Sequence, residues 1–245
     1  MTLPFFKDDK MTRRLALVAA AGLTGAVAFL AVGIGLAGHN PGDVKTLWGA
    51  VGSTCGSSVS AQDQVTLPFD VVDSLEISLP ATVRYEPGER PEMVISGNRS
   101  LLDHVRMEGG KLSLNCDPGW PASPLDVHIS GPAIASWTLN GSVELGLINV
   151  SQPQLRFDLR GSGSITASGA TENVDLTISG SGKAMLKNLT TQSAKVDIRG
   201  NGDAAVTAKT SADVSISGNG NIDLFGNAVL RRSEIRGNGR VTQLP

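Results

Sequence analysis

The sequence has few aromatic residues, few charges and no excess of positive charge. Aromatic residues make up 4% and charged residues 18% of the 245 residues, and the formal net charge is −2. A nucleic-acid-binding domain carries a basic patch and a high isoelectric point, so we predict no nucleic-acid partner. Hydrophobic residues make up 40% of the chain, which is enough to form a core and disfavours full disorder.

Cysteine and histidine are also scarce. Two cysteines and three scattered histidines do not form a pattern typical of a zinc site, so we predict no metal ion and no cofactor. In an oxidising compartment Cys55 and Cys116 are candidates for a disulfide, and two separate thiols are the alternative. No histidine follows His128, and neither His128 nor His104 belongs to a pattern typical of a catalytic triad. We therefore predict that the chain is not an enzyme.

One long segment contains no charged side chain. Residues 15–38 lack Asp, Glu, Lys and Arg, and as a helix they would be about 36 Å long, enough to cross a hydrocarbon core of ~30 Å. The basic segment 1–14 precedes them, and the positive-inside rule keeps that segment in the cytoplasm. The sequence predicts a transmembrane helix over 15–38, with a cleaved signal peptide as the alternative. Either way, the rest of the chain is exported.

The exported part divides into a linker and a β domain. Residues 39–64 are rich in Gly and Ser and have no apolar period, which predicts a flexible linker. From residue 65 to 245, short runs of alternating apolar and polar residues predict strands. Segments 82–96 and 105–116 each indicate strand, turn, strand. Helical periodicity is absent after residue 38 apart from 100–105, which is at best a single turn.

Glycine, in contrast, is abundant, with 29 residues. A recurring Gly-x-Gly motif has its first glycine at Gly161, Gly180, Gly200, Gly218 and Gly237, at spacings of 19, 20, 18 and 19 residues. A degenerate copy contains Gly141. A fixed period near 19 is typical of a repeat architecture.

The residues that flank each motif alternate with period two. The position two residues before the first glycine is always aliphatic: Leu159, Ile178, Ile198, Ile216 and Ile235. Each copy therefore predicts strand, bend, strand. Equivalent strands of successive copies would stack about 4.8 Å apart as a parallel β-solenoid with ~19-residue coils. A meander of antiparallel hairpins is the alternative.

The outward positions predict a charged ladder. The residue before the first glycine alternates between Arg and Ser, and the residue three before alternates between an acid and a hydroxyl. Like charges on stacked coils would therefore lie about 9.6 Å apart, close to the Debye length at physiological salt. A ligand-binding stripe is one interpretation, and a solvated, self-neutral surface is the other. The candidate ligand-binding residues are Asp158, Arg160, Asp197, Arg199, Glu234 and Arg236.

The segment 69–114, followed by the repeated "SGSG" and "GNG" strands, resembles the putative auto-transporter adhesin head GIN domain family. The resemblance covers about 65–245. It implies a bacterial exported domain with a right-handed parallel β-helix and an adhesin-like role. The family has no defined catalytic or binding residues, so none are transferred to this chain.

Together these observations predict an exported, membrane-tethered, non-enzymatic module that binds an envelope protein or a polysaccharide. We expect it in the bacterial cell envelope, anchored in the inner membrane by 15–38 with its domain in the periplasm, or secreted if the signal is cleaved. A passive structural or sensory ectodomain is the main alternative, and a polysaccharide-active enzyme is a weaker one. The last coil has no capping helix before Leu244 and Pro245, so its open strand edges predict end-to-end homo-oligomerisation.

Overall fold

The computed structural model describes residues 54–55, 62–67, 69–70, 72–119 and 122–245, all within one compact unit, Gly52–Pro245. The predicted segments 1–14 and 15–38, and most of the predicted linker 39–64, lie outside the described residues. In the described part of the chain, no helix has both the length and the apolar character that crossing a membrane requires.

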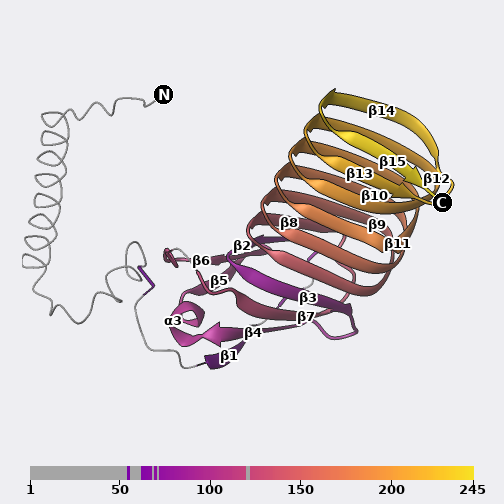
Figure 1. Ribbon diagram of the computed structural model, residues 1–245. Coiled ribbons are helices and arrows are strands. Elements are labelled where there is room, and N and C mark those ends of the chain that lie inside the picture. Colours follow the sequence, from indigo (N-terminus) through magenta and orange to yellow (C-terminus); the bar gives the residue numbers. More distant parts are fainter. Residues whose placement is uncertain (1–53, 56–61, 68, 71, 120–121) are drawn as a thin grey trace, which may run out of the picture. The chain divides into compact units, whose positions relative to one another are not determined.

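The repeats form a parallel β-solenoid of about five turns (Figure 1). Each first glycine pairs with the first glycine of the next copy, and the neighbouring strands run parallel. The predicted parallel stack of equivalent strands is confirmed, and no antiparallel pair occurs among the described repeat strands. The repeat strands are β9 (Glu144–Gly161), β10 (Ser164–Gly180), β11 (Lys183–Gly200), β12 (Asp203–Gly218), β13 (Asn221–Phe225), β14 (Val229–Gly237) and β15 (Arg240–Leu244).

The Gly-x-Gly bends bring successive coils into close contact. At Gly200 the backbone has a φ of +128°, and an added Cβ would lie 2.3 Å from the carbonyl oxygen of Gly180. Only glycine tolerates both conditions. Between the two glycines, asparagines stack into a ladder: Asn219 Nδ2 donates to Asn201 Oδ1 at 2.9 Å, and Asn238 Nδ2 donates to Asn219 Oδ1 at 3.3 Å.

The interior of the solenoid is narrow and aliphatic. The residues two before each first glycine are fully buried in every coil but the last, and they stack in register. Burying such side chains is the main favourable contribution to folding, at about 25 cal/mol per Å² of apolar surface. Aromatic side chains gather instead at the N-terminal end of the stack, where the rings of Tyr85 and Trp137 meet edge-on with centroids 5.3 Å apart.

Four strands outside the repeats extend the solenoid toward the N-terminus. β8 (Ser136–Gly141) and β2 (Ser74–Ser78) continue one face from β9. β3 (Ala81–Pro87) and β7 (Leu125–Gly131) continue another face from β9. All four are parallel to their neighbours in this extension, so the coil geometry persists where the Gly-x-Gly motif is missing.

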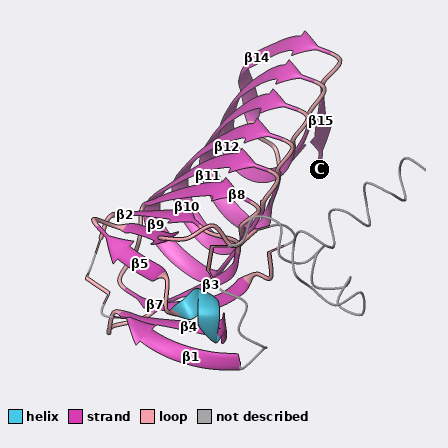
Figure 2. Cartoon of the chain, turned by 90° about the vertical axis from the view of Figure 1, so that its left-hand side faces the viewer, coloured by secondary structure: helices cyan, strands magenta, loops and turns pink. Residues whose placement is uncertain are grey.

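The N-terminal end of the stack is covered by further elements (Figure 2). β4 (Glu92–Asn98) pairs antiparallel with β7, and β1 (Gln62–Leu67) pairs antiparallel with β4. α3 (Arg99–Leu102) follows β4 and confirms the predicted single helical turn. We call the set β1, β4, α3, β5 and β6 the cap.

The predicted second hairpin is present in the cap. β5 (Val105–Glu108) and β6 (Lys111–Leu114) pair antiparallel, and the turn between them has positive φ at Gly109 and Gly110. The first predicted strand–turn–strand segment forms β3 and β4, but these strands do not pair with each other, because β7 lies between them. β1 also includes residues 62–64 of the predicted linker, since their backbone pairs with the edge of β4.

Candidate functional site

The outward side of one solenoid face carries polar side chains in three straight columns, which we call the charged face. Parallel pairing in register aligns every second residue of each strand with its equivalents. Column 1 contains Arg156, Asp175, Lys195, Asp213 and Arg232. Column 2 contains Glu76, Thr138, Asp158, Thr177, Asp197, Ser215 and Glu234. Column 3 contains Ser78, Asn140, Arg160, Ser179, Arg199, Ser217 and Arg236.

The structure brings all six predicted ladder residues together on this face. Each arginine forms an ion pair with the acid two residues before it in the same strand. The closest nitrogen–oxygen distances are 2.6 Å for Arg160–Asp158, 2.7 Å for Arg199–Asp197 and 2.5 Å for Arg236–Glu234. The arginine side chains are 59%, 66% and 77% exposed. A guanidinium has five N–H donors, and the pairing uses only some of them, so donors remain free for a ligand.

Column 1 was not predicted from the sequence. Its charges alternate in sign from coil to coil, so neighbours along the column attract one another. Arg156 lies 3.5 Å from Asp175, and Lys195 lies 3.9 Å from the same carboxylate. Asp213 is paired at 3.0 Å with Arg231, the residue before the column member Arg232. The available signal was positional, because each member lies five residues before a first glycine. The residue type changes at every copy, which conceals the column.

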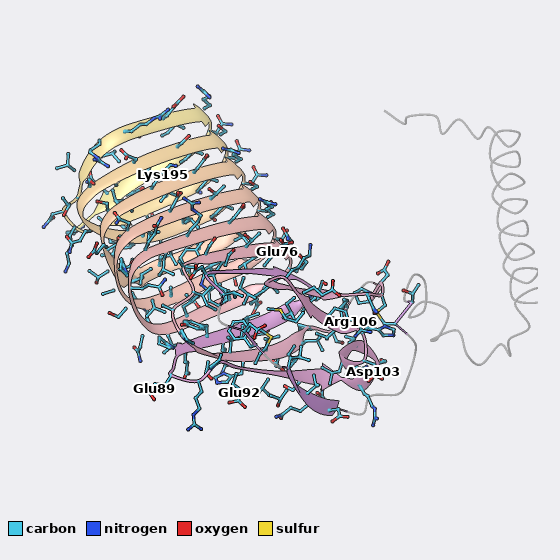
Figure 3. All side chains as sticks on the ribbon, turned by 180° about the vertical axis from the view of Figure 1, so that it is seen from behind. Glu76, Glu89, Glu92, Asp103, Arg106 and Lys195 are labelled. Carbon is cyan, nitrogen blue, oxygen red and sulfur yellow. A yellow bond between two sulfur atoms is a disulfide. The ribbon has the colours of Figure 1, made fainter. Side chains whose placement is uncertain are left out.

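The N-terminal extension of columns 2 and 3 was also not predicted. Glu76 Oε1 accepts hydrogen bonds from Ser78 Oγ and Asn140 Nδ2, each at 3.0 Å, and lies 2.8 Å from Lys111 Nζ. The hydrogen bond from Lys111 is the largest influence on Glu76 and lowers its pKa, against the opposing effect of partial burial. The alternation of acid and hydroxyl therefore runs through seven strands. Figure 3 labels Glu76 in this extension and Lys195 of column 1 among the repeat coils.

The columns are close to electrically neutral and contain a shallow groove. They hold six cationic and six anionic side chains, so the face has no net sign to attract a densely charged polymer. A groove of about 270 Å³ lies over β11, β12 and β14 and is lined by Lys195, Asp197, Asp213, Ser215 and Arg232 among others. Within the described ranges, no group of three or more His, Cys, Asp or Glu residues is placed to hold a metal ion.

Cys55 and Cys116 form a disulfide at the cap, with their Cα atoms 5.2 Å apart. Two hydrogen bonds flank the bridge, from Thr54 N to Asp117 O and from Asp117 N to Thr54 Oγ1, each 2.8 Å long. The chain just before the domain is thereby fixed to the segment that follows β6.

Several solved proteins from Bacteroides and Parabacteroides match this chain in structure. One is a putative adhesin from Bacteroides fragilis, at 15% identity and a TM-score of 0.58, covering 75% of this chain and 97% of that protein. A putative lipid binding protein from Parabacteroides distasonis matches at 16% identity and a TM-score of 0.44, covering 76% and 98%. A putative adhesin from Parabacteroides merdae matches at 15% and 0.43, with the same coverages.

No curated protein sequence matches this chain. The sequence profile of one family does match, over residues 72–228, which include every described strand from β2 to β13 and therefore the whole cap except β1. At 15% identity the structural likeness shows the fold alone, whereas the family profile spans more than half of the chain. The chain therefore belongs to the family of the putative auto-transporter adhesin, head GIN domain.

Proposed function

We propose that this chain is an exported, membrane-tethered, non-enzymatic adhesin-like module that binds an envelope polysaccharide through the charged face. The observation that carries the proposal is a regular alternation, of acid and hydroxyl over the seven strands of column 2 and of Arg and Ser over the last five strands of column 3. Equivalent charged rungs recur about every 9.6 Å. A polymer with its own repeat is the ligand that can contact such a surface many times in the same way.

The chemistry of the face favours a hydroxyl-rich polymer. Paired carboxylates and guanidiniums offer both acceptors and donors at fixed positions, which suits hydroxyl groups that can donate and accept. The near-neutral charge balance disfavours a strongly anionic or cationic partner. Many weak contacts along one chain add up through multivalency. An envelope protein is the second candidate partner.

The other parts of the proposal rest on separate support. The charge-free segment 15–38 supports a tether in the inner membrane, with the domain in the periplasm, or secretion if the segment is cleaved. The family description supports an adhesin-like, non-enzymatic role and, through the sequence resemblance, a right-handed winding of the solenoid.

The decisive experiment replaces the three ladder arginines. The variant R160S/R199S/R236S removes the exposed donors of column 3 but no core contact, so we expect an unchanged far-ultraviolet circular dichroism spectrum. Binding of the full chain to polysaccharide extracted from the envelope of its own host should weaken at least tenfold, measured by co-sedimentation with the insoluble polysaccharide.

A matched control removes three positive charges from other faces. The variant R84S/K183S/K209S changes the net charge equally and should bind as the wild type does. Equal loss in both variants would show a non-specific charge effect and contradict the proposal. Retained binding in R160S/R199S/R236S would exclude the charged face as the site. A wild-type chain that binds no envelope polysaccharide would favour the passive structural or sensory alternative.

A further inference from the structure

A second groove crosses a face of the solenoid other than the charged face. It lies over the first residues of the parallel strands β11, β12, β13 and β15, which pair in that order (Figure 1). Its volume is about 570 Å³, more than twice that of the groove on the charged face. We call this hollow the second groove, and its outward side chains include Lys183, Met185, Asp203, Ala205, Asp223 and Arg240.

The second groove is hollowed at Ala205. The register places Ala205 between Met185 of β11 and Asp223 of β13, and its methyl group is much shorter than either neighbour. Met185 is 47% exposed, so its flexible thioether chain forms an apolar wall. Asp203 lies two residues before Ala205 on the outward side of β12. Asn221 N and Nδ2 donate to Asp203 Oδ1 at 3.2 and 2.9 Å, which orients this carboxylate.

The charges of the second groove are available to a ligand, unlike those of the charged face. Every charged side chain in the three columns of the charged face takes part in an ion pair. In the part of the chain that the structure describes, Lys183, Asp203, Asp223 and Arg240 form no ion pair. A charged ligand would therefore bind these four side chains without displacing an ion pair among the described residues.

These four charges are symmetrically spaced along the stack. Lys183 lies on β11 and Arg240 lies three strands further on, on β15, so their backbone positions are about 14.4 Å apart. Asp203 and Asp223 occupy the two strands between them, with Asp223 displaced by two residues to the side, next to Ala205. The level midway between the two acids lies about 7.2 Å from each cation. The second groove therefore presents positive, negative and positive charge at equal intervals.

An extended peptide has nearly the same repeat. A strand rises about 3.3 Å per residue and alternate side chains point to the same side, so these recur about every 6.6 Å. A segment with the pattern acid–x–base–x–acid places its central basic group between Asp203 and Asp223. Its flanking acids then lie opposite Lys183 and Arg240. The methylene stem of the central side chain packs over Ala205, as the stems of basic residues do on apolar surface.

We propose that the second groove binds an extended peptide segment of the pattern acid–x–base–x–acid, which lies along the stack across β11, β12, β13 and β15. The partner is a protein that carries such a segment on its surface. Charge complementarity selects this occupant, because the reversed pattern base–x–acid–x–base would bring like charges together at all three levels. The second groove is separate from the charged face, so this binding does not depend on the proposed binding of polysaccharide.

Two short peptides test the proposal on the full chain. The probe is Thr-Glu-Thr-Lys-Thr-Glu-Thr with blocked ends and a fluorescent label, and the comparison peptide is Thr-Lys-Thr-Glu-Thr-Lys-Thr. The chain has a formal net charge of −2, so non-specific attraction would favour the comparison peptide, which has a net positive charge. We expect the opposite preference, with the probe bound at least tenfold more tightly by fluorescence anisotropy. Equal binding, or tighter binding of the comparison peptide, would overturn the proposal.

A variant of Asp223 tests where the basic side chain binds. Asp223→Asn should weaken binding of the probe at least fivefold. It should not weaken binding of the same peptide with glutamine in place of lysine, because that peptide lacks the partner of Asp223. Glu108→Gln, which removes an exposed carboxylate from the cap, should bind the probe as the wild type does. Equal weakening of both peptides by Asp223→Asn would contradict the proposed placement.

Variants of the two surfaces separate this proposal from the proposed function. K183Q/R240Q should bind the probe at least tenfold more weakly and should still co-sediment with envelope polysaccharide. R160S/R199S/R236S should bind the probe as the wild type does. Loss of polysaccharide but not of the probe in K183Q/R240Q would show that the second groove takes a charged polysaccharide instead of a peptide. Loss of the probe in R160S/R199S/R236S would place the peptide on the charged face, and either result would overturn the proposal.

Discussion

Glycine has two separate roles at the bends of this solenoid. At Gly200 the backbone has positive φ, and the coil beneath leaves no room for a Cβ. At Gly141 the φ is also positive, at +92°, but an added Cβ would meet nothing within 4 Å. Gly141 is the first bend of the series. β2, the next strand toward the N-terminus on this face, ends before the position opposite Gly141. Comparing Gly141 with Gly200 therefore distinguishes the effect of positive φ from the effect of the close approach between coils.

Alanine at each position should measure the two effects. Gly141→Ala should lower the free energy of unfolding by about 1–2 kcal/mol through positive φ alone. Gly200→Ala should add the cost of overpacking against the carbonyl of Gly180, typically a further 1–3 kcal/mol. Urea denaturation followed by circular dichroism gives both values. Equal losses would contradict a role for glycine in coil spacing.

At the scale of single elements, the sequence predicts the repeat strands well and the remaining strands poorly. β9 to β12 share a motif whose spacing fixes both strand position and register, so their pairing followed from Gly161, Gly180 and Gly200. The pairing of Glu76 with Thr138 joins residues far apart in the chain, and no local pattern specifies it. For the same reason the insertion of β7 between β3 and β4 was not predicted.

The same distinction holds for the candidate site: the part within the repeats was predictable from the sequence, and the rest was not. Columns 2 and 3 were predictable within the repeats because residue types recur beside an invariant glycine. Column 1 was not, because only the attraction between Arg156, Asp175 and Lys195 on adjacent strands makes it a unit, and that requires the register. The N-terminal members required β2 and β8 to be placed next to β9.

Glu76 connects β2 to both of its neighbours, which predicts a pH-dependent contribution to stability. Its pKa is lowered in the folded chain, chiefly by Lys111, so its ionised form favours folding. This contribution is present above the ordinary range of a Glu carboxyl, near pH 4.5, and is lost as the pH falls through the lower folded value. Because the carboxylate is about one-third exposed, we expect less than ~1 kcal/mol.

The variant Glu76→Gln tests this by thermal melts between pH 7 and pH 3. Wild type should be more stable than Glu76→Gln at neutral pH, and the difference should vanish in acid. Glu89→Gln, in the loop between β3 and β4 (Figure 3), should show no such difference at either pH. A stability gap between wild type and Glu76→Gln that stays constant with pH would rule out the ion pair as its cause.

At the scale of the whole domain, the two ends of the solenoid differ. The cap covers the N-terminal end, whereas the last described coil exposes the edge of β14 (Figure 1).

The disulfide should stabilise the cap selectively. It closes a loop of 61 residues, for which the chain-entropy model gives up to about 4 kcal/mol. In the variant Cys55→Ser/Cys116→Ser we expect faster amide hydrogen exchange in β1 and β4 and unchanged exchange in β10 and β11, read by mass spectrometry. As a control, the wild type with reductant should show the same faster exchange in β1 and β4, and the wild type without reductant should not. Uniform loss of protection in all strands would show that the cap and the coils unfold together.

The disulfide also determines how the domain would respond to mechanical load. A pull on the chain before Cys55 passes through the sulfur–sulfur bond directly to Cys116, because covalent connectivity offers this shorter path. Strands β1 to β6, which lie between these two residues, are then relieved of tension and cannot be peeled away one by one. Under force, the first strand to bear load is β7, which is paired on both sides, with β3 and β4. In oxidising surroundings the cap would stay folded under load. In reducing surroundings the edge strand β1 would detach first.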